Sequence, residues 1–280
     1  MTVVDQSQGR AFDDPDVVQS YAARPPYPPE LYQALLGLTQ GRQRAADLGC
    51  GPGKIAQVLA DRFDRVEAID PSAAMIGAGR QQDAGAHTNI EWITAAAEDA
   101  ALAGPYDLVT AGASIHWMRH EIIFPRLAAA MRPAGMFAVI SGDNVSNAPW
   151  HAEWTSFTAQ WLERLGHVPD PQGYDAALRS FEGWIDLAGS ASFSFSFSQP
   201  LSDFITCQHS RATWSRAVMG DSLAEAFDDQ LRATLLPHCV DGRLHYEVES
   251  LLVWGRPRRQ PLTIANAVDE DQSLALNPLA

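Results

Sequence analysis

The chain has 280 residues, 46% of them hydrophobic, which suits a globular protein with a sizeable buried core. Acidic residues outnumber basic ones by 34 to 20, and the resulting net charge of −14 disfavours nucleic acids and anionic membranes as partners. Cysteines without metal-ligand spacing, and the lack of an apolar segment of signal or membrane-spanning length, predict a cytoplasmic protein with reduced thiols.

The first half of the sequence alternates short apolar runs with helical patterns. Pro28 and Pro29 open a helix that carries leucines at helical spacing. The apolar runs predict strands at 45–48, 66–69, 90–93, 106–110 and 136–140. Because helical patterns lie between these runs, the sequence predicts βαβ units and a parallel sheet.

After Asp143 the pattern changes. Aromatic residues recur at near-helical spacing from Trp150 to Trp161, and a stretch rich in proline and glycine follows at 168–173. Phenylalanines alternate with serines over 193–197, which predicts a half-buried strand. The run 251–254 predicts a last strand, and the aperiodic residues 258–280 predict a flexible tail.

The run from Asp47 to Gly53 places a glycine at every second position directly after the first predicted strand. Glycine adopts backbone conformations that side chains would block, so a ligand can lie against the main chain there. The next predicted strand ends at Asp70, whose carboxylate is placed to accept hydrogen bonds from a ribose. Together these features predict a nucleotide-like ligand at the head of a parallel sheet.

The Gly-x-Gly-x-Gly spacing resembles the S-adenosylmethionine loop of class I methyltransferases, and further motifs extend the resemblance over about residues 11–257. Within that class the chain looks like the small-molecule branch that includes trans-aconitate methyltransferases. The motifs that carry the resemblance are Phe12, Tyr21, Arg24-Pro25-x-Tyr27-Pro28, residues 47–53, Asp70-Pro71-Ser72, Ala97-Glu98-Asp99, Ile115-His116-Trp117 and Gly255-Arg256-Pro257.

The resemblance implies an α/β, Rossmann-like fold. Its sheet would have seven mostly parallel strands with an antiparallel last strand. A single domain would cover residues 1–257, with a helical cap over about 145–190.

The resemblance also implies which residues bind S-adenosylmethionine. The residues under the methionine and ribose would be Gly49, Gly51 and Gly53. Asp47 would order the loop or receive the methionine ammonium, and Asp70 would hold both ribose hydroxyls. Many relatives carry an aspartate where this chain has Ala96, so Glu98 or the backbone around Ala97 would receive the adenine amino group.

Tyr21 and Arg24 lie before the helix at Pro28, in a segment that folds over the cofactor in this family. We therefore expect both to contribute to the cofactor site. Alternatively, Arg24 would bind a substrate carboxylate in a bidentate manner, or form only a surface salt bridge.

On the acceptor side, the resemblance points to His116 at the end of the fourth predicted strand. His116 would face the transferring methyl as a base or hydrogen-bond donor, or would only line the pocket. Trp117 would either stabilise the cationic sulfonium through its ring face or serve as a packing residue. Tyr27 and Trp150 are the other predicted substrate-binding residues.

We expect no metal ion. His116 and His120 have helical ligand spacing but lack an accompanying acid, so zinc is disfavoured. Asp143-Asn144 is similar to the metal-binding pair of magnesium-dependent catechol methyltransferases, but the aspartate that those enzymes need after the fourth strand is missing.

The predicted function is therefore methyl transfer from S-adenosylmethionine to a small molecule, at oxygen, by in-line displacement. One alternative is a S-adenosylmethionine-binding enzyme with a non-methylating reaction. Another is an NAD(P)-dependent oxidoreductase, which is disfavoured because the Tyr-x-x-x-Lys pair of its short-chain form is absent. Lys54 is the only lysine, and Cys50 stands four residues before it.

Overall fold

The computed structural model describes residues 12–167 and 179–262. These residues build an eight-stranded sheet with the order β3-β2-β1-β4-β5-β8-β6, and β7 pairs with β8 off this path. The strands are β1 (Arg44–Leu48), β2 (Arg65–Asp70), β3 (Ile90–Thr94), β4 (Tyr106–Gly112), β5 (Met131–Ile140), β6 (Asn144–Ser146), β7 (Ile185–Pro200) and β8 (Arg243–Pro257). Strands β1 to β5 pair in parallel, and β8 is antiparallel to β5, β6 and β7.

The predicted Rossmann-like, mostly parallel sheet with an antiparallel last strand is confirmed, but its strand count was one too low. The additional strand is β6, which has only three residues. A segment this short cannot display the period-two pattern by which strands are recognised in a sequence.

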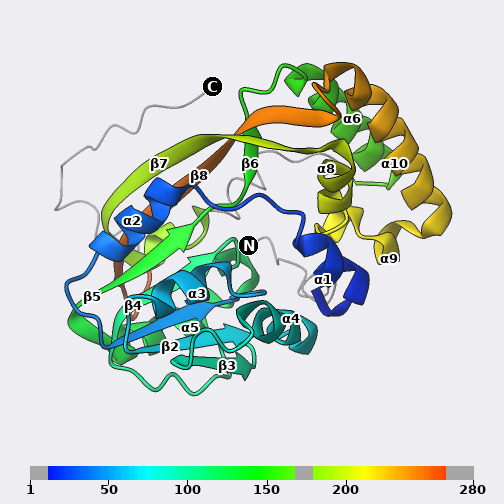
Figure 1. Ribbon diagram of the computed structural model, residues 1–280. Coiled ribbons are helices and arrows are strands. Elements are labelled where there is room, and N and C mark those ends of the chain that lie inside the picture. Colours follow the sequence, from blue (N-terminus) through cyan, green and yellow to red (C-terminus); the bar gives the residue numbers. More distant parts are fainter. Residues whose placement is uncertain (1–11, 168–178, 263–280) are drawn as a thin grey trace.

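Helices cover both faces of the sheet (Figure 1). The helices α2 (Pro29–Gly37), α3 (Lys54–Ala60) and α4 (Ala73–Asp83) bury Leu35, Leu59 and Ile76 on one face. The helix α5 (His120–Ala130) buries Phe124 and Leu127 on the other. The central strands are therefore buried on both sides, which explains their continuous apolar runs.

A helix precedes α2, although the sequence analysis expected α2 to be the first. This helix, α1 (Pro15–Tyr21), begins after Asp14, whose side chain accepts a hydrogen bond from the Asp16 N–H at 2.8 Å. An aspartate cap followed by proline at the first helical position is a recognisable start signal. Tyr21 is thus the last residue of α1, and residues 22–28, here called the strap, connect α1 to α2.

A group of helices forms a cap beside the sheet (Figure 1). The cap consists of α6 (His151–Arg164), α8 (Leu201–Gln208), α9 (Arg216–Met219) and α10 (Asp221–Leu235). It has its own apolar core, which includes Trp150, Trp161 and Phe227. The cap therefore extends well beyond the expected 145–190, and residues 185–190 belong to strand β7 instead.

Trp150, a predicted substrate-binding residue, lies in the core of the cap. Its side chain is fully buried in the cap core and contacts the rings of Phe204 and Tyr246 at centroid distances of 5.2 and 5.8 Å. The aromatic spacing correctly predicted a helix, but the apolar face of that helix packs inward.

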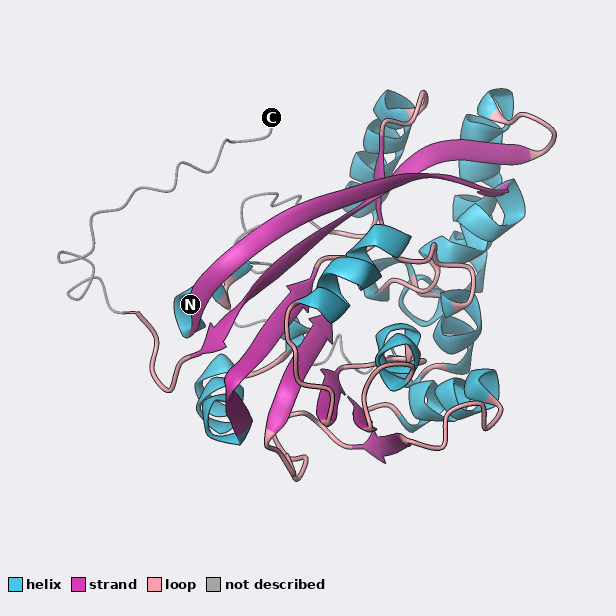
Figure 2. Cartoon of the chain, turned by 60° about the vertical axis from the view of Figure 1, so that its left-hand side comes forward, coloured by secondary structure: helices cyan, strands magenta, loops and turns pink. Residues whose placement is uncertain are grey.

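Strands β7 and β8 form a long antiparallel ribbon that reaches from the sheet to the cap (Figure 2). Their pairing runs from Ile185 opposite Pro257 to Pro200 opposite Arg243. The strands predicted at 193–197 and 251–254 both lie within this ribbon. The stretch at 168–173 and most of the predicted tail lie outside the described residues. Within the described part of the chain, every helix is too short or too polar to span a bilayer.

Candidate functional site

A cavity of about 380 Å³ opens at the carboxyl ends of the parallel strands. Its lining comes from residues 12–13, 21 and 24, the loop positions 49 and 51, residues 70–72 and 75, and segments 96–99, 112–114 and 117–119. Strand β1 pairs with β2 on one side and with β4 on the other. The chain connections run outward from β1 in opposite directions, and such a switch point is where open α/β sheets bind ligands.

The glycine loop brings bare backbone to this cavity. Gly49 and Gly51 line it with φ values of +62° and +52°, which side chains rarely adopt. A methyl group added to Gly49 would lie 2.5 Å from Cβ of Ser114. Gly53 is different, because it does not line the cavity and a methyl group there would lie 2.3 Å from the Trp92 ring. Gly53 therefore permits close packing and the start of α3.

Asp70 lies at the rim of the cavity at the end of β2. One carboxylate oxygen accepts the Gly51 N–H at 2.8 Å, and the other accepts the Ser72 N–H at 2.9 Å. Burial raises the pKa of Asp70, although these two hydrogen bonds oppose the shift. Asp70 thus orders the glycine loop and still presents lone pairs to the cavity that it lines. Ser72 caps α4, as expected, by accepting the Met75 N–H.

Asp47 lies beneath the loop and is only 1% exposed. Its Oδ1 accepts the Thr110 hydroxyl at 2.7 Å, whereas Oδ2 has no hydrogen-bond partner among the described residues. Burial raises the pKa of Asp47 to about 7. Asp47 is not among the residues that line the cavity, so its predicted contact with the methionine ammonium stays a prediction.

Ala97 and Glu98 both line the cavity, as predicted. Their backbone carbonyls are occupied, because each accepts a hydrogen bond from the Arg126 guanidinium. The Glu98 carboxylate accepts the Arg119 N–H at 2.6 Å and lies 3.8 Å from Nε of the same residue. The Glu98 side chain and the two carbonyls thus all accept hydrogen bonds from the protein, and the contact with the adenine amino group stays a prediction.

His116 lies on a short turn, Ile115–Trp117, between β4 and α5. Its neighbours Ser114 and Trp117 line the cavity, but His116 is not among the lining residues, in contrast to the expectation. Its Nδ1 is buried and has no partner in the described part of the chain. Burial, with a smaller contribution from His120, lowers the pKa of His116 to about 4, so the imidazole is neutral at pH 7.

The strap and the end of α1 close one side of the cavity. Tyr21 and Arg24 line it, as expected. Arg24 is not a surface salt bridge: its Nε donates to the Ser210 hydroxyl at 2.7 Å and Nη2 donates to the Ser210 carbonyl at 2.8 Å. Tyr27 is absent from the cavity lining. Its hydroxyl would lie 3.1 Å from a methyl group added to Gly112, which does line the cavity, so the predicted substrate contact stays a prediction.

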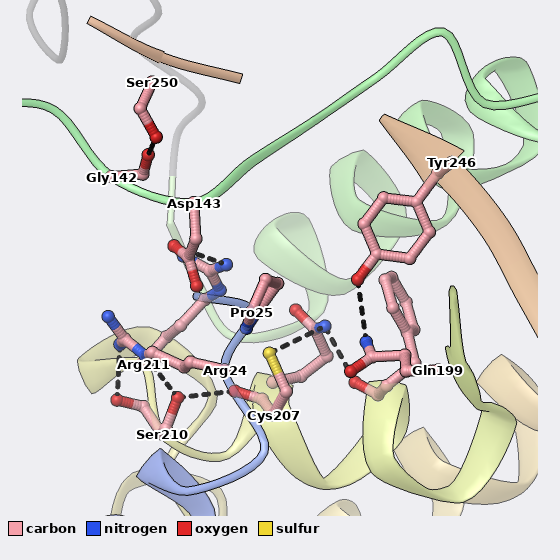
Figure 3. A network of polar contacts seen from close by, with 12 residues as sticks. Arg24, Pro25, Gly142, Asp143, Gln199, Cys207, Ser210, Arg211, Tyr246 and Ser250 are labelled. Atoms are coloured by element: carbon pink, nitrogen blue, oxygen red, sulfur yellow. Dashed lines mark hydrogen bonds and ion pairs between the residues drawn. The ribbon is translucent and has the colours of Figure 1, made fainter. Parts of the chain in front are cut away.

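A charge cluster around the buried Asp143 adjoins Arg24 between the strap and the cap (Figure 3). The Arg211 guanidinium lies 3.3 Å from Oδ1 of Asp143. Burial raises the pKa of Asp143, but the charges of Arg211, Arg24 and Lys54 together outweigh it and leave the pKa below its ordinary value. Lys54 Nζ donates to the carbonyls of Arg24 and Pro25 at 3.1 and 3.0 Å. The cluster combines three cations with one carboxylate.

No pattern in the sequence predicts this cluster, because Arg211 lies 68 positions from Asp143 and meets it only in the folded chain. Asp143 was considered as half of a magnesium site, but its carboxylate pairs with Arg211 instead. Nor do the described residues contain a group of three or more histidine, cysteine or acidic side chains suited to a metal ion.

Comparison with known proteins agrees with this geometry. Residues 45–135 match the model of a methyltransferase domain family. A trans-aconitate 2-methyltransferase of Acidovorax sp. (strain JS42) is 34% identical over 146 residues, which cover 50% of this chain and 54% of that protein. One from Paracidovorax citrulli (strain AAC00-1) is 39% identical over 125 residues, 43% of this chain and 47% of the relative. The chain thus spans about half the length of the curated relatives it matches.

The fold has a counterpart among solved structures. A candidate type II methyltransferase from Anaeromyxobacter dehalogenans superposes with a TM-score of 0.67 at 22% identity, covering 85% of this chain and 99% of that one. The family match includes the glycine loop and Asp70, the residues that shape the cavity. Residues 45–135 are thus similar to a methyltransferase domain, and the chain shares the fold of a solved methyltransferase structure.

Proposed function

We propose that the chain is an enzyme that transfers the methyl group of S-adenosylmethionine to a carboxylate oxygen of a small acceptor. The observation that carries the choice of acceptor is the charge cluster. In a chain of net charge −14, three cations gather around one carboxylate directly behind the cavity wall. Arg24 belongs both to this cluster and to the cavity lining. The local excess of positive charge favours an anion.

The residues present fit the cofactor. The bare backbone at Gly49 and Gly51 allows close approach, and Asp70 offers a carboxylate to ribose hydroxyls. The unpartnered Oδ2 of Asp47 would receive the ammonium of the methionine part. When bound, S-adenosylmethionine supplies a methyl group on a positively charged sulfur, with its leaving group already activated.

The protein's own contribution is to orient the acceptor and exclude water. A carboxylate is ionised at neutral pH and needs no base, so this proposal assigns no proton transfer to His116. Arg24 would instead hold the acceptor through its guanidinium edge. The curated relatives named above are trans-aconitate 2-methyltransferases, which also supports a carboxylate acceptor.

The direct test uses S-adenosylmethionine labelled in its methyl group and a panel of carboxylic acids that includes trans-aconitate. We expect label in an acid product, and we expect mild base to release it as methanol, because carboxylate methyl esters hydrolyse whereas ethers and methylamines do not. Label that resists base would place the methyl group on another kind of atom. Binding of S-adenosylmethionine without transfer to any acceptor would instead indicate a non-methylating protein.

Two substitutions separate the acceptor classes. With a carboxylate acceptor, Arg24→Ala should raise KM for the acceptor by about 10- to 150-fold, since a charge-assisted hydrogen bond contributes roughly 1.5–3 kcal/mol. His116→Ala should alter kcat less than Arg24→Ala alters KM. An exposed arginine, Arg62→Ala, is the control. If His116→Ala instead lowers kcat by about 10²–10⁴-fold, a hydroxyl or amine acceptor with a histidine base replaces this proposal.

The raised pKa of Asp47 predicts opposite pH effects on stability and on cofactor affinity. The buried site favours the neutral carboxyl group of Asp47. The stabilisation of the folded state by this preference is fully present below the unfolded-state pKa of 3.8, and it is lost as the pH rises through about 7 and the buried group must ionise. Asp47→Asn should therefore stabilise the unliganded protein at pH 8, by up to about 4 kcal/mol, and much less at pH 5.

Cofactor affinity of the wild type should fall below pH 7, as Asp47 becomes neutral. Urea unfolding and calorimetry at both pH values check this, and equal pH profiles for the two proteins would contradict it.

A further inference from the structure

Ser210 holds Arg24 from the cap side. It follows α8, is fully buried, and lies 186 positions from Arg24 in the sequence. Its hydroxyl donates its one hydrogen to the Cys207 carbonyl at 2.6 Å. The oxygen is therefore oriented as an acceptor, and it receives the Arg24 Nε–H at 2.7 Å. Figure 3 shows this chain of contacts between the strap and the cap.

Arg24 is fixed on two further sides. Its guanidinium lies over the Tyr21 ring, 4.4 Å from the centroid. Its main-chain carbonyl accepts a hydrogen bond from Lys54 Nζ. A guanidinium carries five N–H groups in a rigid plane, and the two bonds to Ser210 use Nε and Nη2. Ser210 thereby determines which edge of the plane remains for a ligand.

We propose that Ser210 is a positioning residue for the acceptor, acting through Arg24 although it does not itself line the cavity. The inference rests on the proposed function insofar as Arg24 binds an acceptor carboxylate. Without the Ser210 hydroxyl, Arg24 regains side-chain freedom that acceptor binding must then restrict. The Ser210 carbonyl still accepts Nη2, so one of the two hydrogen bonds between the strap and the cap is lost and the other remains.

The kinetic test compares Ser210→Ala with Ser210→Thr, which keeps the hydroxyl. Ser215→Ala is the matched control, because Ser215 is also a fully buried cap serine that donates to the carbonyl three residues earlier, at 3.1 Å from Ala212 O. With trans-aconitate as the probe, Ser210→Ala should raise KM roughly ten-fold, the effect of losing one hydrogen bond to a charged group. The kcat and the cofactor Kd should stay within about two-fold, and Ser210→Thr should restore KM.

A second readout does not depend on turnover. Lys54 is the only lysine in the chain, and burial lowers its pKa to about 8, so an acetylating reagent at pH 8 modifies one side chain beneath the strap. Lys54 Nζ donates to the main-chain carbonyls of Arg24 and Pro25, so a strap that is held less firmly through the Arg24 side chain should expose Lys54 more often. The acetylation rate of Lys54, followed by peptide mass spectrometry, should rise several-fold in Ser210→Ala and stay unchanged in Ser215→Ala.

The two readouts separate the two claims. If the wild type methylates no carboxylate, the proposed function fails, and the Lys54 rate alone decides whether Ser210 positions Arg24. If the wild type is active and KM is the same in Ser210→Ala and Ser215→Ala, Ser210 does not position the acceptor. Equal Lys54 rates in an inactive protein would also overturn the inference.

Discussion

Asp70→Ala should weaken binding of S-adenosylmethionine by about 10- to 150-fold, corresponding to a loss of roughly 1.5–3 kcal/mol. The carboxylate lies at the cavity rim, and the same two oxygens hold the Gly51 and Ser72 N–H groups. Its removal deprives two ribose hydroxyls of a charged acceptor and releases the glycine loop. Isothermal titration calorimetry with the cofactor measures the loss directly.

The matched control is Asp107→Ala. Asp107 is also buried and its carboxylate accepts two backbone N–H groups, those of Gln43 and Arg44 at 2.9 and 3.1 Å, but it does not line the cavity. Both substitutions should lower the free energy of unfolding, whereas only Asp70→Ala should lower cofactor affinity. Equal cofactor affinity in both variants would remove Asp70 from the site.

Phe227→Ala should destabilise the cap by about 3–5 kcal/mol, the usual range for removing a fully buried phenylalanine. Phe227 lies in the centre of the cap core, with ring centroids 5.0 Å from Phe157, 5.2 Å from Trp161 and 5.3 Å from Trp214. Replacement by alanine leaves a cavity at this aromatic cluster. Denaturant unfolding followed by tryptophan fluorescence checks the change, since the cap contains several tryptophans.

The same variant should distinguish cofactor binding from acceptor binding. Every described residue that lines the cavity precedes position 120, so cofactor affinity should be retained in the folded protein. Acceptor KM should rise, because Phe227 contacts the His209 ring next to Ser210. Phe227→Leu, which conserves most of the volume, should show much smaller effects. Loss of cofactor affinity without any change in acceptor KM would contradict this division.

Much of the sheet could be predicted because the residues that determine each strand are neighbours in the sequence. Buried parallel strands such as Ala45–Leu48 are continuous apolar runs, and glycine with a following acid shows where a ligand approaches the backbone. The cofactor side of the site follows from these elements. Gly49, Gly51 and Asp70 were accordingly placed at the cavity by sequence reasoning alone.

The acceptor side depends on contacts between distant segments. Arg24 and Ser210 are 186 positions apart in the sequence, so no periodic pattern of residues links them. The pairing of Asp143 with Arg211 likewise forms only when the chain is folded. Aromatic spacing predicted the helix after Trp150 but not the direction of its apolar face. Similarly, Tyr27 lies in the strap, as Arg24 does, but is not among the residues that line the cavity.

The β7–β8 ribbon has a mechanical consequence. Its 16-residue strand β7 corresponds to about 50 Å of extended chain, and the pairing runs over its whole length with one register shift, between Leu187 and Gly189. One end is anchored in the sheet through β5, and the other is built into the cap core through Leu244 and Tyr246. Displacement of the cap relative to the sheet must therefore bend the whole ribbon. The restoring force is distributed along the paired strands and is not concentrated at a single hinge residue.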